Sequence, residues 1–292
     1  MKIAAAAYPP QWHGDWGALA AKIADWVADA AGQGADLLVF PEYGGAEVAL
    51  IGAPHVQAPA DTRALMVAHA DAWRDLHRDL AQRHAVHVLA GSLVVMTARG
   101  PVNRAWLCGP SGGALACDKL IPTPYERHAL GLVSGSGVAL AQTALGLIGV
   151  SICYDSEFPL LARTMVEAGA DLLLVPSCTD FPAGQTRVRQ SCRARAIEGQ
   201  IAVVQAPLVG GAPGCDVVDV NTGRAGIFCP PDHGLPADGI IAQGATDVPG
   251  WTCANVDLAV VTAARREGQV GNMVHWPEQE AFRAPVVPQR LD

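Results

Sequence analysis

The chain of 292 residues contains only three lysines, against seventeen arginines, and has no long run of basic residues. Its formal net charge is −8, so it lacks the basic surface that contacts with nucleic-acid phosphates require. No apolar stretch reaches the ~20 residues of a membrane span. The apolar run in MKIAAAAYPPQW ends at Pro9 and is too short for a signal-peptide core. These absences exclude nucleic-acid and membrane partners and favour a small-molecule partner.

Disulfide and metal-binding patterns are also missing. The eight cysteines are scattered without a CxxC pair, and the nine histidines form no HExxH motif. Scattered cysteines of this kind predict reduced thiols in a cytoplasmic protein, and most of them should be small core residues. No metal site is expected.

Apolar runs of strand length alternate with segments of helical period along most of the chain. Half of the residues are apolar, which is enough for a large core. We expect strands at residues 2–8, 36–40, 86–96, 146–153, 171–175 and 201–207, helices at 15–33, 61–84, 159–168 and 186–198, and hairpins at 102–120 and 215–229. Residues 1–267 are predicted to form one domain, and residues 268–292 an extended C-terminal arm that packs on the body or on a partner subunit.

Two strand ends in this pattern are near twins. GADLLVFPEYGG starts at Gly34 and GADLLLVPSCTD starts at Gly169, and each follows an Ala-rich amphipathic run. The strands are continuously apolar, which predicts that both of their faces are buried. The repeat therefore predicts a pseudo-symmetric, layered α/β domain in which related strand ends converge on one site.

Three polar residues follow apolar strands, namely Glu42, Lys119 and Cys153. Because the chain otherwise uses arginine for positive charge, Lys119 is expected to serve as a compact ammonium close to a developing oxyanion. Cys153 precedes a helix start, and the positive end of that helix would favour the thiolate. Glu42 near a thiol and an ammonium can act as a base.

The order of VFPE, DKLIPTPYER and GVSICYDSEFP resembles the nitrilase superfamily of carbon-nitrogen hydrolases, in its amidase-like branch. The resemblance implies an αββα sandwich of two packed sheets flanked by helices. It also implies a cofactor-independent thiol hydrolase that cleaves a small carboxamide or N-carbamoyl compound, and an oligomer of at least two subunits. The implied catalytic roles are Glu42 as general base and acid, Cys153 as nucleophile, and Lys119 with the Tyr154 N–H as oxyanion donors. Glu126 matches a second glutamate that helps to position the substrate and to orient Lys119.

The substrate is expected to be bound by Tyr154 and by the residues after the second twin strand, Ser177, Cys178 and Thr179, which should line the pocket. Three alternatives stay open from the sequence. A nitrile substrate is disfavoured because Tyr154 and Asp155 stand where true nitrilases usually have Trp-Glu. The intact Glu, Lys and Cys set argues against a non-catalytic metabolite-binding module. A redox-sensing pair of Cys153 and Cys178 is the third alternative.

Overall fold

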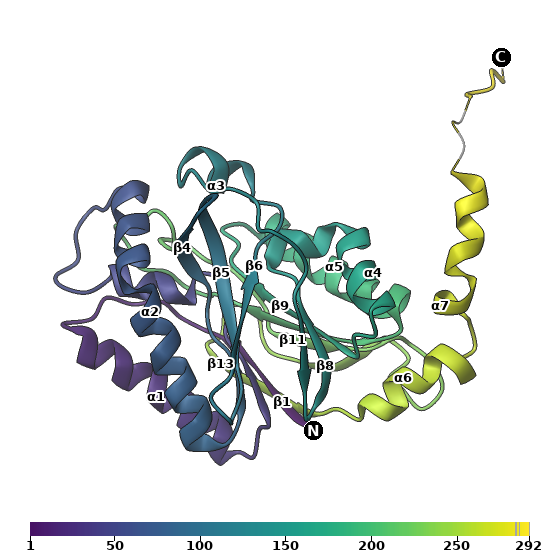
Figure 1. The fold of residues 1–292 in the computed structure, drawn as a ribbon, viewed down its shortest axis with the longest axis horizontal. Helices are drawn as coiled ribbons and strands as arrows, with labels where there is room; N and C mark the ends of the chain where they lie inside the picture. The colour runs from purple at the N-terminus through teal and green to yellow at the C-terminus, as the bar shows by residue number, and fades with distance from the viewer. Residues whose placement is uncertain (284, 286, 292) are drawn as a thin grey trace.

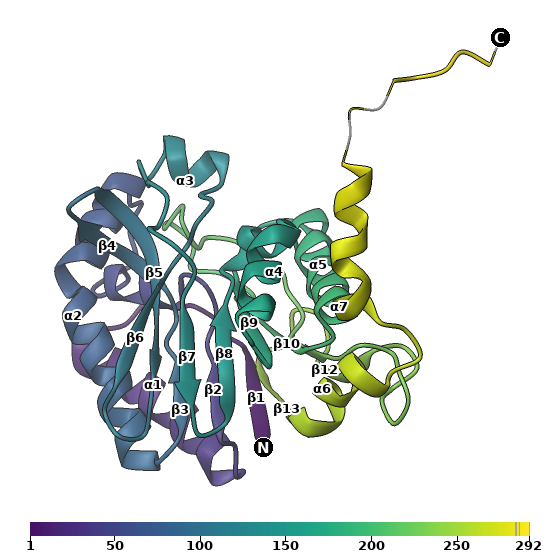
Figure 2. The same ribbon diagram turned by 45° about the vertical axis from the view of Figure 1, so that its right-hand side comes forward.

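The computed structural model describes residues 1–283, 285 and 287–291. Two mixed β-sheets pack against each other, with α1 and α2 on one side and α4 and α5 on the other (Figures 1 and 2). The first sheet contains β1 (Lys2–Ala7), β2 (Leu37–Val39), β3 (His87–Leu89), β4 (Leu93–Thr97), β5 (Gly100–Cys108), β6 (Ala114–Asp118) and β13 (Gly250–Asn255). The second contains β7 (Leu140–Thr143), β8 (Gly146–Val150), β9 (Leu172–Ser177), β10 (Ala202–Pro207), β11 (Gly226–Phe228) and β12 (Ile240–Gln243).

Alternate side chains of β1 enter different cores because successive residues of a strand point to opposite faces. Ile3 and Ala5 belong to the core that includes the second sheet. Ala4 and Ala6 pack with the apolar faces of α1 (Trp16–Gly32) and α2 (Pro59–His84). The first sheet is therefore buried on both faces, as its continuously apolar strands predict.

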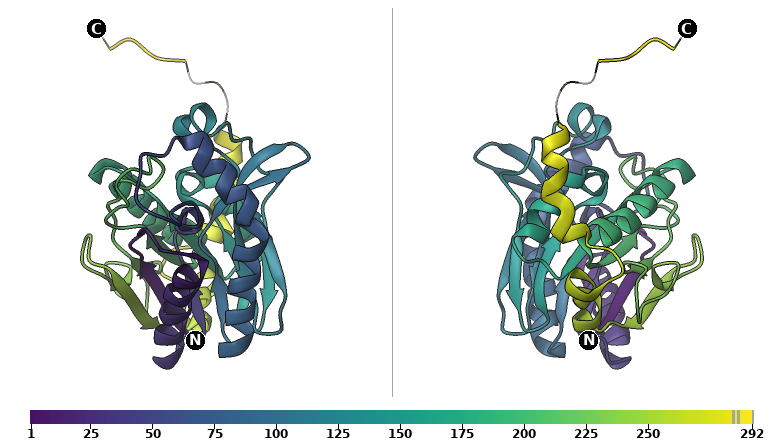
Figure 3. Two further views of the ribbon diagram at one scale, coloured as in Figure 1. Left: turned by 90° about the vertical axis from the view of Figure 1, so that its left-hand side faces the viewer. Right: turned by 90° about the vertical axis from the view of Figure 1, so that its right-hand side faces the viewer.

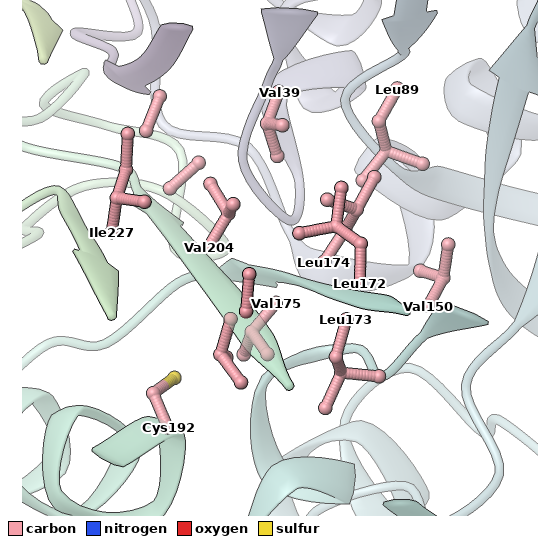
Figure 4. Close-up of a cluster of buried hydrophobic side chains, with 14 of the residues drawn as sticks. Val39, Leu89, Val150, Leu172, Leu173, Leu174, Val175, Cys192, Val204 and Ile227 are labelled. Atoms are coloured by element: carbon pink, nitrogen blue, oxygen red, sulfur yellow. The ribbon is translucent and has the colours of Figure 1, made fainter. Parts of the chain in front are cut away.

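The second sheet follows the same alternation. Leu172 and Leu174 of β9 point toward Val39 and Leu89 of the first sheet, whereas Leu173 points the other way (Figure 4). The outer face of this sheet is covered by α4 (Pro159–Glu167) and α5 (Pro182–Gly199), on the side opposite α1 and α2 (Figure 3). The predicted αββα sandwich is confirmed.

The strand expected at residues 86–96 is divided into β3 and β4. Gly91 lies in the break, where a Cβ atom would stand 2.9 Å from the Cα of Gly44. Only glycine permits this close approach of two backbones. The break also allows Ser92 to bind the neighbouring loop, because its hydroxyl accepts a 2.9 Å hydrogen bond from the Tyr43 N–H. The interruption thus supports the loop that carries Glu42.

The hairpin expected at residues 215–229 is wrong, since only β11 forms in this range and it pairs with β10 and β12. Asn221, near the middle of this range, donates side-chain hydrogen bonds to the carbonyl oxygens of Gly210 and Val218 at 3.2 and 3.1 Å. These bonds close a loop in place of a strand pair. The hairpin expected at residues 102–120 is confirmed as β5 and β6.

The C-terminal part contains elements that the sequence pattern did not predict. β13 pairs antiparallel with β1 and is followed by α6 (Leu258–Glu267). The segment after residue 267 is helical over α7 (Asn272–His275) and η3 (Trp276–Phe282), so it is not an extended arm there. Arg163 of α4 lies 4.3 Å from the ring centroid of Trp276, which holds this segment on the body. Within the described residues, none of the helices is both long enough and apolar enough to cross a membrane.

Replacing Leu174 with alanine is expected to lower the free energy of unfolding by about 2–5 kcal/mol, because the cavity would open between the sheets. Urea denaturation measures this loss. Leu160 of α4 is 62% exposed, so Leu160→Ala is a matched control that should change stability by no more than about 0.5 kcal/mol. Equal losses in the two variants would contradict the placement of Leu174 in the core.

Candidate active site

The loops that follow the twin strands meet in the folded protein. Glu42 comes shortly after β2, and Cys178 comes directly after β9. The Cys178 N–H donates a 3.0 Å hydrogen bond to Glu42 Oε2, although the two residues are 136 positions apart in the chain. The predicted convergence of related strand ends is therefore confirmed.

Lys119 follows β6 and is buried between two carboxylates. Its Nζ lies 2.7 Å from Glu42 Oε1 and 2.7 Å from Glu126 Oε2. Burial disfavours the ammonium, but the charges of the two glutamates outweigh burial and raise the pKa of Lys119 well above its usual value. The side chain is therefore a permanent cation that both carboxylates share.

Glu126 belongs to α3 (Pro124–His128), a short helix within the Pro-rich loop. Thr123 forms a reciprocal cap with it: the Glu126 N–H donates to the Thr123 hydroxyl at 3.2 Å, and the Thr123 N–H donates to Glu126 Oε2 at 2.7 Å. Burial opposes ionisation, but Lys119 and the Thr123 N–H hold the pKa of Glu126 below its usual value. Glu126 is therefore a stable anion beside Lys119.

Glu42 has a different electrostatic environment, although it shares the same cation. Burial raises the pKa of Glu42 to about 7 against the opposing charge of Lys119, and the neighbouring charge of Glu126 contributes to the rise. A carboxylate with this pKa both takes and gives protons near neutral pH. Their different surroundings thus make Glu42 a group that titrates near neutral pH and keep Glu126 an anion.

Cys153 is the first residue of η2 (Cys153–Glu157) and has a left-handed backbone conformation with φ of 50°. Its Sγ points to the carbonyl oxygen of Cys178 at 3.6 Å, and the N–H of that residue binds Glu42. Burial and the charge of Glu42 raise the pKa of the thiol well above its usual value, and Lys119 offsets them only in part. The expected thiolate is therefore corrected, because burial outweighs the dipole of a short 3₁₀ segment and the sulfur keeps its proton.

A cavity of about 310 Å³ opens onto these groups. Glu42, Lys119, Glu126 and Cys153 all contribute to its lining. The other lining residues include Tyr43, Tyr125, Tyr154, Glu157, Cys178, Thr179, Asp180, Phe181, Arg187, Val188, Asp216 and Val217.

Three of the four residues predicted to bind substrate lie at this cavity, namely Tyr154, Cys178 and Thr179. Ser177 does not line it. Ser177 is the last residue of β9, is buried, and pairs with Pro207 of β10. Cys178, one position further along, is the residue that reaches Glu42.

Sequence reasoning missed two residues that support the catalytic candidates. Asn103, a polar residue within the apolar strand β5, donates to Glu42 Oε1 at 2.9 Å and to Glu126 Oε1 at 3.0 Å. Asp155 accepts hydrogen bonds from the Leu120 and Ile121 N–H groups at 2.9 and 2.8 Å and so holds the backbone that follows Lys119. A buried polar residue in an apolar strand was the available signal for Asn103, whereas the sequence marked Asp155 only as part of the Tyr-Asp pair after Cys153.

The family model for carbon-nitrogen hydrolases matches residues 2–266, which include the whole cluster described above. The chain belongs to the carbon-nitrogen hydrolase family.

The hydrolase fold is also that of solved members of the nitrilase superfamily. An amidase from Nesterenkonia sp. AN1, a glutamate-to-glutamine mutant with acrylamide added at its active-site cysteine, is 25% identical with a TM-score of 0.68, over 91% of this chain and 97% of that chain. Nit3 of Saccharomyces cerevisiae is 17% identical with a TM-score of 0.70, over 91% and 93%, and supports the fold alone.

Curated relatives of this chain include the probable hydrolase YhcX of Bacillus subtilis, which is 32% identical over 80% of this chain and 45% of that protein. A deaminated glutathione amidase of Synechocystis is 30% identical over 77% of this chain and 80% of that protein. The chain spans about half the length of the first curated relatives that it matches.

The pKa of Glu42 leads to a pH dependence for the reactivity of Cys153. Alkylation by iodoacetamide is expected to accelerate as the pH rises through about 7, because only ionised Glu42 can accept the thiol proton. Peptide mass mapping measures the rate at Cys153 separately from the other thiols. In Glu42→Gln the step near pH 7 should be absent, and a step that persists in this variant would show that another group is the base.

Proposed function

We propose that this family member hydrolyses the C–N bond of a small carboxamide or N-carbamoyl compound through a cysteine thioester and without a cofactor. The observation that carries the proposal is the meeting of a protonated thiol, a carboxylate with a pKa of about 7 and a buried ammonium at one cavity. A thiol beside a base and a cation is the arrangement that nucleophilic catalysis requires. The amidase names of several relatives support the same substrate class.

In the first half-reaction Cys153 Sγ attacks the carbonyl carbon while its proton passes to Glu42. The resulting oxyanion is stabilised by the Lys119 ammonium and the Tyr154 N–H. Collapse of the tetrahedral intermediate breaks the C–N bond, and Glu42 returns the proton to the departing ammonia or amine. The acyl group remains on Cys153 as a thioester.

In the second half-reaction water replaces the amine. Glu42, ionised again, takes a proton from the water as its oxygen attacks the thioester carbonyl. The second tetrahedral intermediate breaks the C–S bond, the thiol regains its proton from Glu42, and the carboxylic acid leaves. A base with a pKa near 7 suits both directions of transfer, because it is neither too weak to accept a proton nor too strong to release one.

Glu126 is proposed to act on Lys119 and not on the substrate proton. Its lowered pKa keeps it ionised throughout the cycle, so it balances the ammonium when Glu42 becomes neutral. Without this second anion, protonation of Glu42 would leave Lys119 as an uncompensated buried charge.

Ammonia release from a panel of amides, N-carbamoyl amines and nitriles tests the proposed substrate class. Turnover of nitriles alone would favour the nitrilase alternative. Binding of metabolites without turnover would favour a non-catalytic module. Reversible peroxide oxidation of Cys153 and Cys178 without turnover of any panel compound would favour the redox alternative.

The acyl group is expected to accumulate on Glu42→Gln. Hydrolysis of the thioester depends on general-base help worth about 10² to 10⁴ in rate, whereas a residual thiolate beside Lys119 can still attack a reactive ester or amide. Intact-mass analysis after incubation should show one added acyl group, which peptide digestion should map to Cys153.

Hydroxylamine should discharge this adduct as a hydroxamate, and Cys153→Ala should form none. The compound has to be one that the wild-type enzyme hydrolyses, so that a lack of adduct in Glu42→Gln cannot come from a compound that does not bind. If it does and Cys153 of Glu42→Gln stays unmodified, water attacks the substrate directly and the thioester mechanism is wrong.

Lys119→Arg is expected to lower kcat/KM by about 10² to 10³, nearly as much as Lys119→Ala. The planar guanidinium is too large for the space between two carboxylates that each lie 2.7 Å from the ammonium. Lys2→Arg is a matched control, because Lys2 Nζ donates to the backbone carbonyl oxygen of Gln33 at 2.6 Å and, among the described residues, forms no ion pair. Wild-type rates in the Lys119→Arg variant would show that this position supplies only diffuse charge.

A further inference from the structure

Asn103 lies between the two glutamates of the site and is 1% exposed. Its Nδ2 is 2.9 Å from Glu42 Oε1 and 3.0 Å from Glu126 Oε1. Carboxylate oxygens only accept hydrogen bonds, so the amide nitrogen has to face them. Within the described part of the chain the Asn103 Oδ1 is buried without a hydrogen-bond partner, so these two donations are what orient the side chain.

The two oxygens of Glu42 are not equivalent. Oε1 accepts from Lys119 Nζ at 2.7 Å and from Asn103, whereas Oε2 accepts from the Cys178 N–H at 3.0 Å. Each carboxylate oxygen offers about two lone pairs, so both lone pairs of Oε1 are engaged and one of Oε2 stays free. The thiol of Cys153 points to the carbonyl oxygen of Cys178, the residue whose N–H binds Oε2.

We propose that Asn103 is a positioning residue that reserves Oε2 of Glu42 for the thiol proton. The proposal rests on the proposed function. With Oε1 fully engaged, the proton of Cys153 passes to Oε2 and leaves from Oε2 to the departing amine, without rotation of the carboxylate. A neutral amide suits this task because it donates to both glutamates and adds no charge to the cluster.

The titration of Glu42 reports on this bond independently of turnover. The titratable groups that face Glu42 are Lys119, Glu126, Tyr43, Cys153 and Cys178. The side chain of Asn103 does not titrate. Removing it takes away a donor that favours the ionised carboxylate and leaves every neighbouring charge in place, so the pKa of Glu42 should rise.

The experiment measures alkylation of Cys153 by iodoacetamide against pH, with kcat and KM for an amide that the wild type hydrolyses. Asn103→Leu should move the midpoint of the alkylation profile upward by about one pH unit. It should also lower kcat at least tenfold, with a smaller change in KM. Asn103→Asp has the same shape but adds a third carboxylate, so its midpoint should rise further than that of Asn103→Leu.

Gln200→Leu is the matched control for loss of a buried amide. Gln200 donates to the Ala264 and Val270 carbonyl oxygens at 2.7 and 3.1 Å, away from the cavity. This variant should lower thermal stability and leave the midpoint unchanged.

An unchanged midpoint in Asn103→Leu overturns the proposal. If that variant does not fold, the same result in Asn103→Asp overturns it. Alkylation needs no substrate, so a shifted midpoint in a protein that hydrolyses no amide would contradict the proposed function and leave the role of Asn103 toward Glu42 standing.

Discussion

The buried ammonium of Lys119 between two carboxylates is the interaction on which the site depends. Two anions and one cation enclosed together carry a net negative charge in a medium that disfavours any charge. The cost of burying this charge affects the pKa values of the two glutamates differently. Glu126 stays ionised because Lys119 and its helix cap stabilise the anion. Burial and the charge of Glu126 instead raise the pKa of Glu42 to about 7. The base near neutral pH is therefore a consequence of the second glutamate as well as of burial.

Each charged residue of this cluster is positioned by a different element of the fold. Glu42 follows a strand of the first sheet, Lys119 the end of a hairpin, and Glu126 lies in a short capped helix. The second sheet contributes Cys178, whose N–H donates to Glu42 and whose carbonyl oxygen accepts from the Cys153 thiol. Close packing of the two sheets thus sets the distance between Glu42 and Cys153, and a loosened core would affect the chemistry as well as stability.

The thiol and the base form one proton-sharing unit. Burial and the charge of Glu42 both raise the pKa of Cys153, which favours a neutral thiol beside the Glu42 carboxylate over an ion pair. In the proposed mechanism, the Cys153 proton passes to Glu42 while the sulfur attacks a substrate carbonyl near Lys119.

The sequence by itself predicted the alternation of strands and helices and a layered α/β domain, because these depend on local periodicity. It singled out Glu42, Lys119 and Cys153 as candidates by their positions after apolar strands, and it indicated the αββα class and Glu126 through the resemblance of its motifs to a family. Tertiary structure decided the rest. The hairpin expected at residues 215–229 does not form, because the Asn221 side chain binds the Gly210 carbonyl oxygen and closes a loop. Ser177 pairs within the second sheet, and the next residue, Cys178, donates its N–H to Glu42. Asn103 and Asp155 acquired their roles only through partners far along the chain, and the pKa values of Glu42 and Cys153 follow from burial and neighbouring charge. Hydrogen bonds, desolvation and charge coupling between distant residues leave no periodic trace in a sequence, so only the folded chain sets them.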